Sequence, residues 1–201
     1  MGPVAALALD LTGRVLDRNG APLADAVVFV EAVPPGATLP TPAATQVMDQ
    51  INKQFVPRVL PVMVGTAVRF PNHDQIHHHV YSFSKAKTFE IPLYKDEPAP
   101  PIVFDQLGAV TLGCNIHEWM RGVVLVLPTP LFAVTGADGT FVLRALPEGR
   151  SRIAAWHEGA RRGIEESARE VEVGAATAPL PFTLGVPQRR GRGGGRERGY
   201  E

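Results

Sequence analysis

The sequence has a single cysteine, no net charge and no long apolar run, and each shortage excludes a class of protein. The lone cysteine, Cys114, cannot close an internal disulfide, so the chain is not a small disulfide-bonded scaffold. Its 20 basic and 20 acidic residues balance, so the chain as a whole has no strong field for nucleic acid or membrane. No apolar run can cross a bilayer, and the short run Val4–Leu9 lacks the basic start of a secretory signal.

Proline and glycine are abundant instead, with 19 and 20 residues, and they separate short β-branched and aromatic runs. This pattern predicts an all-β protein. Turn signals at Arg18-Asn19-Gly20, Ala137-Asp138-Gly139 and Pro147-Glu148-Gly149 support it. The segment Gly159–Glu170 has the charge mix of a helix and equally that of a solvated loop. The predicted strands are Gly13–Leu16, Ala26–Val33, Ala67–Phe70, Val80–Phe83, Ile102–Phe104, Ala109–Gly113, Gly122–Leu127, Thr140–Leu143 and Arg152–Trp156.

The segment Cys114-Asn-Ile-His117-Glu-Trp-Met120 carries the clearest chemical signal. It places a thiolate, an imidazole and a thioether in a tight turn between two apolar strands. Soft sulfur ligands together with imidazole suit copper, because Cu(I) favours thiolate and thioether. A trigonal set of two histidines and one cysteine with a weak axial methionine is the blue-copper arrangement, and it requires one further histidine.

A run of three histidines, His77-His78-His79, supplies the missing imidazole. It follows the strand that ends at Pro71-Asn72 and opens the next strand at Val80. Alternate residues of a strand share a face, so His78 lies on the same face as Val80, which is a natural core residue. This parity leaves His79 open as the ligand, because His79, Tyr81 and Phe83 also form an apolar-leaning face. The isolated His73 and His157 have ordinary readings as polar surface residues.

With these motifs in place, residues 46–128 resemble the plastocyanin, azurin and amicyanin cupredoxins, and also periplasmic proteins labelled methylamine utilization proteins. The resemblance is carried by Gly65–Asn72, by His78-His79-Val80 and by Phe104–Val123, whose short ligand loop is most similar to that of amicyanin. It implies a cupredoxin-like Greek-key sandwich or barrel. In this family the ligand histidine is followed by Asn and then by a core Val. Aligned on Val80, that pattern favours His78 over His79 and puts His77 last.

The resemblance also implies a function. Residues His78, Cys114, His117 and Met120 would bind one Cu(I)/Cu(II) ion as a type 1 centre, and the protein would carry single electrons. It would be periplasmic and monomeric, would meet redox partner proteins transiently and would not be an enzyme. The ring edge of His117 would reach the surface, with Trp119 and Pro71 forming an apolar patch around it.

The segments that flank this region resemble two parts of a carboxypeptidase regulatory-like, or transthyretin-like, β-sandwich. The first part begins at Gly13-Arg-Val-Leu and runs to Val30, and the second contains Thr135-Gly-Ala-Asp-Gly139 and Leu146-Pro-Glu-Gly149. We therefore expect a discontinuous sandwich over residues 10–33 and 131–186, with the cupredoxin domain, residues 46–128, inserted between its strands. One larger sandwich without a boundary is the alternative. The Arg/Gly-rich tail, residues 187–201, is expected to be disordered and not to bind nucleic acid.

Other functions remain open from the sequence. The extra histidines are compatible with copper storage or delivery without a redox role. His77-x-His79 also matches the H-x-H pattern of trinuclear copper enzymes, although one such pair cannot complete that centre in a monomer. Finally, the flanking sandwich could bind a partner or a glycan while copper merely stabilises the fold.

Overall fold

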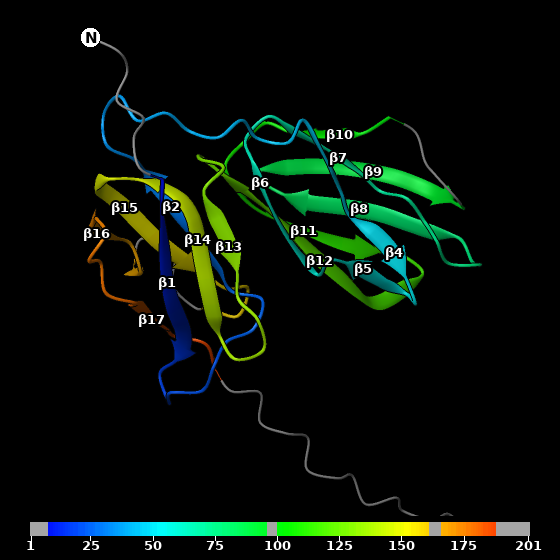
Figure 1. Ribbon diagram of the computed structural model, residues 1–201. Coiled ribbons are helices and arrows are strands. Elements are labelled where there is room, and N and C mark those ends of the chain that lie inside the picture. Colours follow the sequence, from blue (N-terminus) through cyan, green and yellow to red (C-terminus); the bar gives the residue numbers. More distant parts are fainter. Residues whose placement is uncertain (1–7, 96–99, 161–165, 188–201) are drawn as a thin grey trace, which may run out of the picture.

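The computed structural model describes residues 8–95, 100–160 and 166–187, and in these residues the chain folds into β-sheets that form two sandwiches side by side (Figure 1). The prediction of an all-β protein is confirmed. Over the same residues, no helix is long and apolar enough to cross a membrane. The predicted disordered tail lies outside the described residues, except for Pro187.

One sandwich is built from the two ends of the described chain. Its first sheet has the order β14-β1-β17 and its second the order β13-β2-β15-β16. The apolar faces of the two sheets enclose a core that includes Val15, Val28, Phe141 and Ile153. The strands are β1 (Ala8–Asp17), β2 (Val27–Ala32), β13 (Phe132–Val134), β14 (Thr140–Pro147), β15 (Gly149–Trp156), β16 (Arg169–Val173) and β17 (Leu180–Leu184).

The other sandwich comes from the middle of the chain. A five-stranded sheet, β6-β12-β11-β8-β9, belongs to it together with the three-stranded sheet β10-β7-β3 and the hairpin β4-β5. Its core includes Phe55, Phe70, Phe104 and Val124. The strands are β3 (Thr45–Val47), β4 (Asp49–Ile51), β5 (Gln54–Val56), β6 (Val59–Met63), β7 (Thr66–Arg69), β8 (His78–Ser84), β9 (Lys87–Tyr94), β10 (Ile102–Phe104), β11 (Gly108–Cys114) and β12 (His117–Leu127).

A third apolar cluster joins the two sandwiches. Val27, Phe29 and Ala154 of β2 and β15 are buried against Val59, Leu125 and Leu127 of β6 and β12. Beside this cluster, Arg58 forms ion pairs with Asp25 and Glu158. The buried residues of the two main cores come from 48–126 and from 11–30 with 131–184, respectively. Because the third cluster draws on both sets, the division into domains at 10–33, 46–128 and 131–186 stays a prediction.

Every strand predicted from the sequence overlaps an observed one, and the three turn glycines, Gly20, Gly139 and Gly149, all have positive φ. The helical alternative for Gly159–Glu170 is wrong at its end, because Arg169 and Glu170 belong to β16; residues 161–165 lie outside the description. Strands β6 and β9 escaped prediction because each contains a proline, Pro61 or Pro92. Both are outer strands of their sheet, where a missing backbone donor is tolerated.

Candidate metal centre

Cys114 and His117 are brought together by the tight turn between β11 and β12. Cys114 ends β11, His117 begins β12, and the two residues pair across the turn after a register shift at Gly113. The Cys114 Sγ atom lies 3.6 Å from His117 Nδ1. Gly113 allows this irregularity to sit under Tyr81, since a Cβ atom there would meet the Tyr81 ring at 2.7 Å. The C-x2-H spacing therefore places both side chains at one point, as the sequence predicts.

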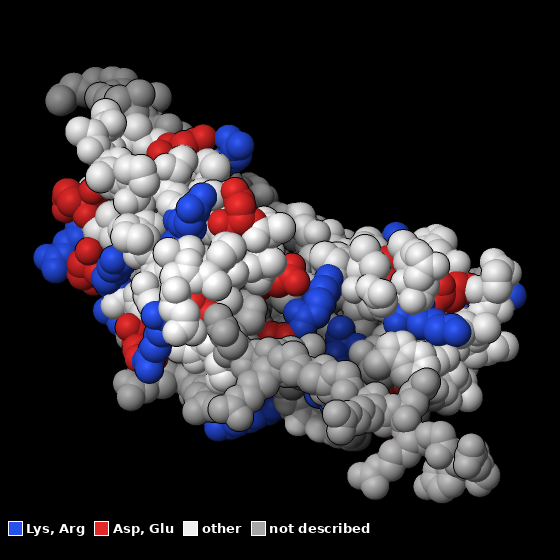
Figure 2. All heavy atoms as spheres, turned by 90° about the horizontal axis from the view of Figure 1, so that it is seen from below, with Lys and Arg blue, Asp and Glu red and all other residues white. Residues whose placement is uncertain are grey.

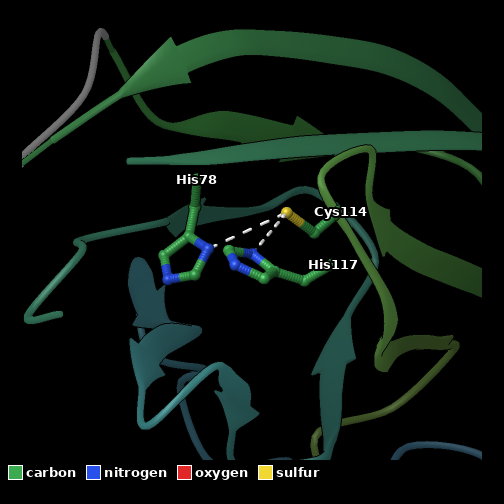
Figure 3. A group of neighbouring side chains, drawn as sticks. All are labelled: His78, Cys114 and His117. Carbon is green, nitrogen blue, oxygen red and sulfur yellow. Dashed lines mark hydrogen bonds between the residues drawn. The ribbon is translucent and has the colours of Figure 1, made fainter. Parts of the chain in front are cut away.

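His78 completes the group from the neighbouring strand. It begins β8, is fully buried, and its Nδ1 atom lies 3.8 Å from Cys114 Sγ (Figure 3). One ligand atom from each of His78, Cys114 and His117 lies within 4.8 Å of the other two. No other group of three or more His, Cys, Asp or Glu side chains meets this criterion in the described residues. A single ion could therefore contact all three side chains.

The structure separates the three adjacent histidines. His78 points into the sandwich, whereas His79 points to the opposite face, where its Nε2 atom contacts Glu90 Oε1 at 2.8 Å. The other ring nitrogen of His79 is buried and has no hydrogen-bond partner in the described structure. His77 is exposed. Strand alternation thus brings His78, not His77 or His79, to the candidate centre.

Met120 is placed next to the group. It is 1% exposed and belongs to the same apolar cluster as Cys114, and both residues line one hollow of the sheet face. The loop spacing C-x2-H-x2-M therefore carries the thioether back into the core. Its role as a fourth ligand stays a prediction.

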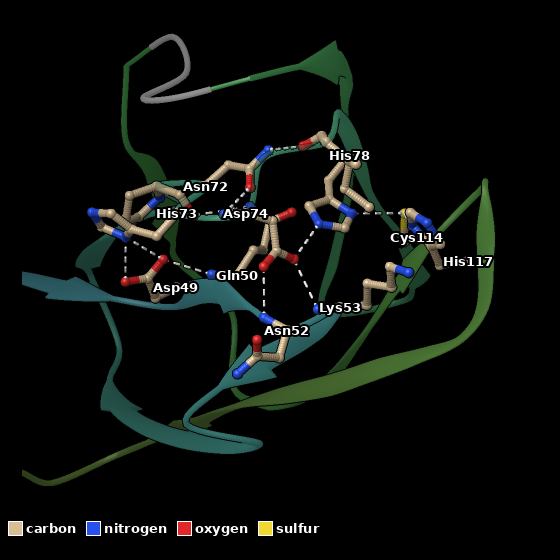
Figure 4. A network of polar contacts seen from close by, with 12 residues as sticks. Asp49, Gln50, Asn52, Lys53, Asn72, His73, Asp74, His78, Cys114 and His117 are labelled. Carbon is tan, nitrogen blue, oxygen red and sulfur yellow. Dashed lines mark hydrogen bonds and ion pairs between the residues drawn. The ribbon is translucent and has the colours of Figure 1, made fainter.

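Asp74 is a site residue that the sequence analysis missed. Its Oδ2 atom lies 2.7 Å from His78 Nε2 (Figure 4). Desolvation on its own would raise the pKa of Asp74, but hydrogen bonds from the Lys53 backbone, the His78 ring and the Asn52 backbone lower it. The ionised carboxylate accepts a hydrogen bond from the Nε2–H group of His78, so Nδ1 keeps its lone pair on the side of Cys114. Asp74 precedes His78 by four residues in a loop, and no sequence pattern predicts a contact at that spacing.

The loop that carries Asp74 is itself well anchored. Asn72 is buried, accepts a hydrogen bond from the Asp74 N–H at 3.0 Å and donates to the carbonyl groups of Ile76 and Tyr94. The Tyr94 hydroxyl donates to the Phe70 carbonyl, and burial raises the pKa of Tyr94 to about 12, so this hydroxyl keeps its proton. These hydrogen bonds therefore fix the loop that precedes His78.

His117 lies closer to the surface than His78. Its ring packs edge-on against those of His78 and Trp119, with centroids 4.9 Å and 5.4 Å away. Desolvation is the main cause that lowers the pKa of His117, and the positive charge of Lys53 adds to it, which favours the neutral ring that a metal requires. Trp119 is 68% exposed and Ile116 49% exposed, so apolar surface adjoins this ligand loop.

The chemistry of these donors fits copper. A thiolate and two imidazoles, with a thioether beside them, form the set that type 1 copper sites use. The fixed tautomer of His78 leaves the correct nitrogen unprotonated, and Cys114 and Met120 lie together in an apolar cluster.

No protein-family model matches the chain, and no curated protein matches it. Solved structures that are similar to part of the chain include an oxidized mutant of amicyanin. The two are 26% identical, the match covers 40% of this chain and 79% of the amicyanin chain, and the TM-score is 0.37. A purple cupredoxin from Nitrosopumilus maritimus has 26% identity over 41% of this chain and 98% of that one, with a TM-score of 0.36. A Cu-containing nitrite reductase from Thermus scotoductus SA-01 has 26% identity over 48% of this chain and 25% of that one, with a TM-score of 0.38.

Proposed function

We propose that this protein binds one copper ion as a type 1 centre and carries single electrons between redox partners. The observation that carries the proposal is the convergence of Cys114 Sγ with the Nδ1 atoms of His78 and His117, at 3.8 Å and 3.6 Å. When bound there, copper would supply the one-electron exchange between Cu(II) and Cu(I). Cys114, His78 and His117 would hold the ion, and Met120 would be a weaker fourth ligand.

The scaffold around these side chains supports transfer rather than catalysis. With the ligand set complete there is no open coordination position for a substrate, in contrast to a catalytic metal site. Cys114 and His117 sit on a turn between two paired strands, and His78 begins a third strand of the same sheet. Side chains held by a sheet move little, which lowers the reorganisation that accompanies a one-electron change.

The surface around His117 is suited to a transient contact with a redox partner. We propose that electrons pass through the His117 edge and that exposed Trp119 and Ile116 form the apolar contact around it. On the face of the molecule in Figure 2, basic and acidic side chains are interspersed, so a partner of strong charge of one sign is not favoured on that face. Encounters between redox proteins are typically small and short-lived. A periplasmic location and a monomeric state are proposed with this function, on the resemblance to cupredoxins.

Electrochemistry of the copper-loaded protein tests the electron-carrier role. We expect a stoichiometry of one copper per chain and a reversible one-electron couple that survives repeated cycles, because both oxidation states accept the same ligands. Release of the metal on each reduction would contradict electron transfer and indicate copper delivery instead. Binding of a second copper per chain would indicate storage, which the separation of His77, His78 and His79 disfavours.

A further inference from the structure

The tip of the β4-β5 hairpin has an unusual backbone. Its two residues, Asn52 and Lys53, both have left-handed φ angles, 54° and 57°. This is the conformation of a two-residue hairpin turn, in which glycine or asparagine is favoured. Asn52 suits the first position, whereas a lysine at the second is strained. A strained residue that persists at a turn indicates that the surrounding contacts require it.

The left-handed turn directs both of its backbone N–H groups at one carboxylate. Asn52 N donates to Asp74 Oδ1 at 2.6 Å, and Lys53 N donates to Asp74 Oδ2 at 2.8 Å. The same Asp74 carboxylate also accepts a hydrogen bond from His78, with Nε2 2.7 Å from Asp74 Oδ2 (Figure 4). Three donors from two separate segments therefore hold a side chain that is only 12% exposed.

The base of the hairpin is rigidly attached to the sandwich. Gln50 is fully buried, and its side-chain amide donates to the Pro71 carbonyl and contacts the Tyr94 hydroxyl. On the other strand, Phe55 is buried against Gly122, where a Cβ atom would approach Phe55 to 2.9 Å. The tip is thus fixed relative to the sheet that carries His117.

The side chain of Lys53 points toward the other histidine. In Figure 4 it extends from the turn toward Cys114 and His117. Among the described residues, Lys53 forms no ion pair with an acidic side chain.

We propose that the Asn52-Lys53 turn is a positioning element for both histidines of the centre. Through its two amides it fixes Asp74, which sets the ring orientation and tautomer of His78. Through the Lys53 ammonium it places a permanent positive charge beside His117. The first effect increases metal affinity, and the second disfavours the more positive Cu(II) form and so raises the reduction potential. This inference rests on the proposed function, but its first half concerns the metal-free protein as well.

The Asp74 half is tested with Asp74→Asn in the full chain, because an amide cannot accept from both turn amides and from His78. Long-range ¹⁵N–¹H spectra of the metal-free protein are expected to show His78 as the pure Nε2–H tautomer in the parent and as a mixture in the variant. Copper affinity is expected to fall about 10–100-fold. The matched control is Asp105→Asn, which removes an exposed carboxylate paired with Lys87. An unchanged tautomer in folded Asp74→Asn protein would overturn this half, whether or not the parent binds copper.

The Lys53 half is tested with Lys53→Gly, which keeps the backbone amide and the left-handed turn but removes the ammonium. The His78 tautomer should be unchanged, and the ratio of Cu(II) to Cu(I) at a fixed applied potential should rise at least about three-fold. Lys85→Gly removes the same charge at the far end of β8 and should leave this ratio as in the parent. If the two variants have equal potentials, the Lys53 charge does not tune the centre. If the parent shows no copper couple at all, the proposed function fails instead.

Discussion

Replacing Cys114 by serine is expected to abolish the intense visible absorption of the Cu(II)-loaded protein together with its one-electron couple. The absorption of a type 1 centre arises from charge transfer between a thiolate and Cu(II), and a serine hydroxyl stays protonated and cannot replace the thiolate. Copper affinity should fall by more than the roughly 10–100-fold that follows loss of an outer hydrogen-bond partner. Absorption spectra and copper titrations of the two proteins measure both effects.

The Cys114→Ser result needs a control for folding, because Cys114 is buried between the sheets. A serine hydroxyl without a partner at this position costs about 1–3 kcal/mol, which leaves a folded protein to measure. Thr111→Ser on the exposed face of the same strand is the matched variant and should keep the full spectrum. An intense band that survives in folded Cys114→Ser protein would exclude this thiolate as a ligand.

Replacing Phe29 by alanine is expected to lower the free energy of unfolding by about 3–5 kcal/mol. Phe29 is 1% exposed and lies in the apolar cluster that joins the two sandwiches, so truncation leaves a cavity there. For a chain of this length, that loss corresponds to a fall of about 10 °C in the midpoint of thermal unfolding. Calorimetry measures the change directly.

The comparison variant for Phe29→Ala is Val103→Ala on β10, because Val103 is 46% exposed. Its effect should stay within about 0.5 kcal/mol. If Phe29→Ala is equally mild, the cluster between the sandwiches contributes little, and the two bodies are held together mainly by the chain connections.

The local part of the candidate centre could be predicted from sequence, because it depends on a few consecutive residues. The spacing of Cys114 and His117 in a short turn fixes their proximity whatever the rest of the fold does. His78 required a longer argument, in which strand alternation and the family pattern chose it from three neighbours. In the structure, His78 Nδ1 lies 3.8 Å from Cys114 Sγ, and His79 contacts Glu90.

The hydrogen bonds that surround the centre could not be predicted in the same way. Asp74 accepts hydrogen bonds from the backbone N–H groups of Asn52 and Lys53, which lie on a hairpin that was not predicted because β4 and β5 are too short to show alternation. Strands β6 and β9 were not predicted, because they contain Pro61 and Pro92 and proline argues against a strand. For Asp74 the missing information was a contact between distant segments, and no local preference encodes it.

The most direct test of the whole account is the absorption spectrum of the parent protein after one equivalent of Cu(II) is added. If the sulfur of Cys114 and the two imidazoles share the ion, the solution turns intensely coloured and the band disappears reversibly on reduction. A colourless Cu(II) complex would show that the ion is bound without the thiolate, and the proposed centre would be wrong.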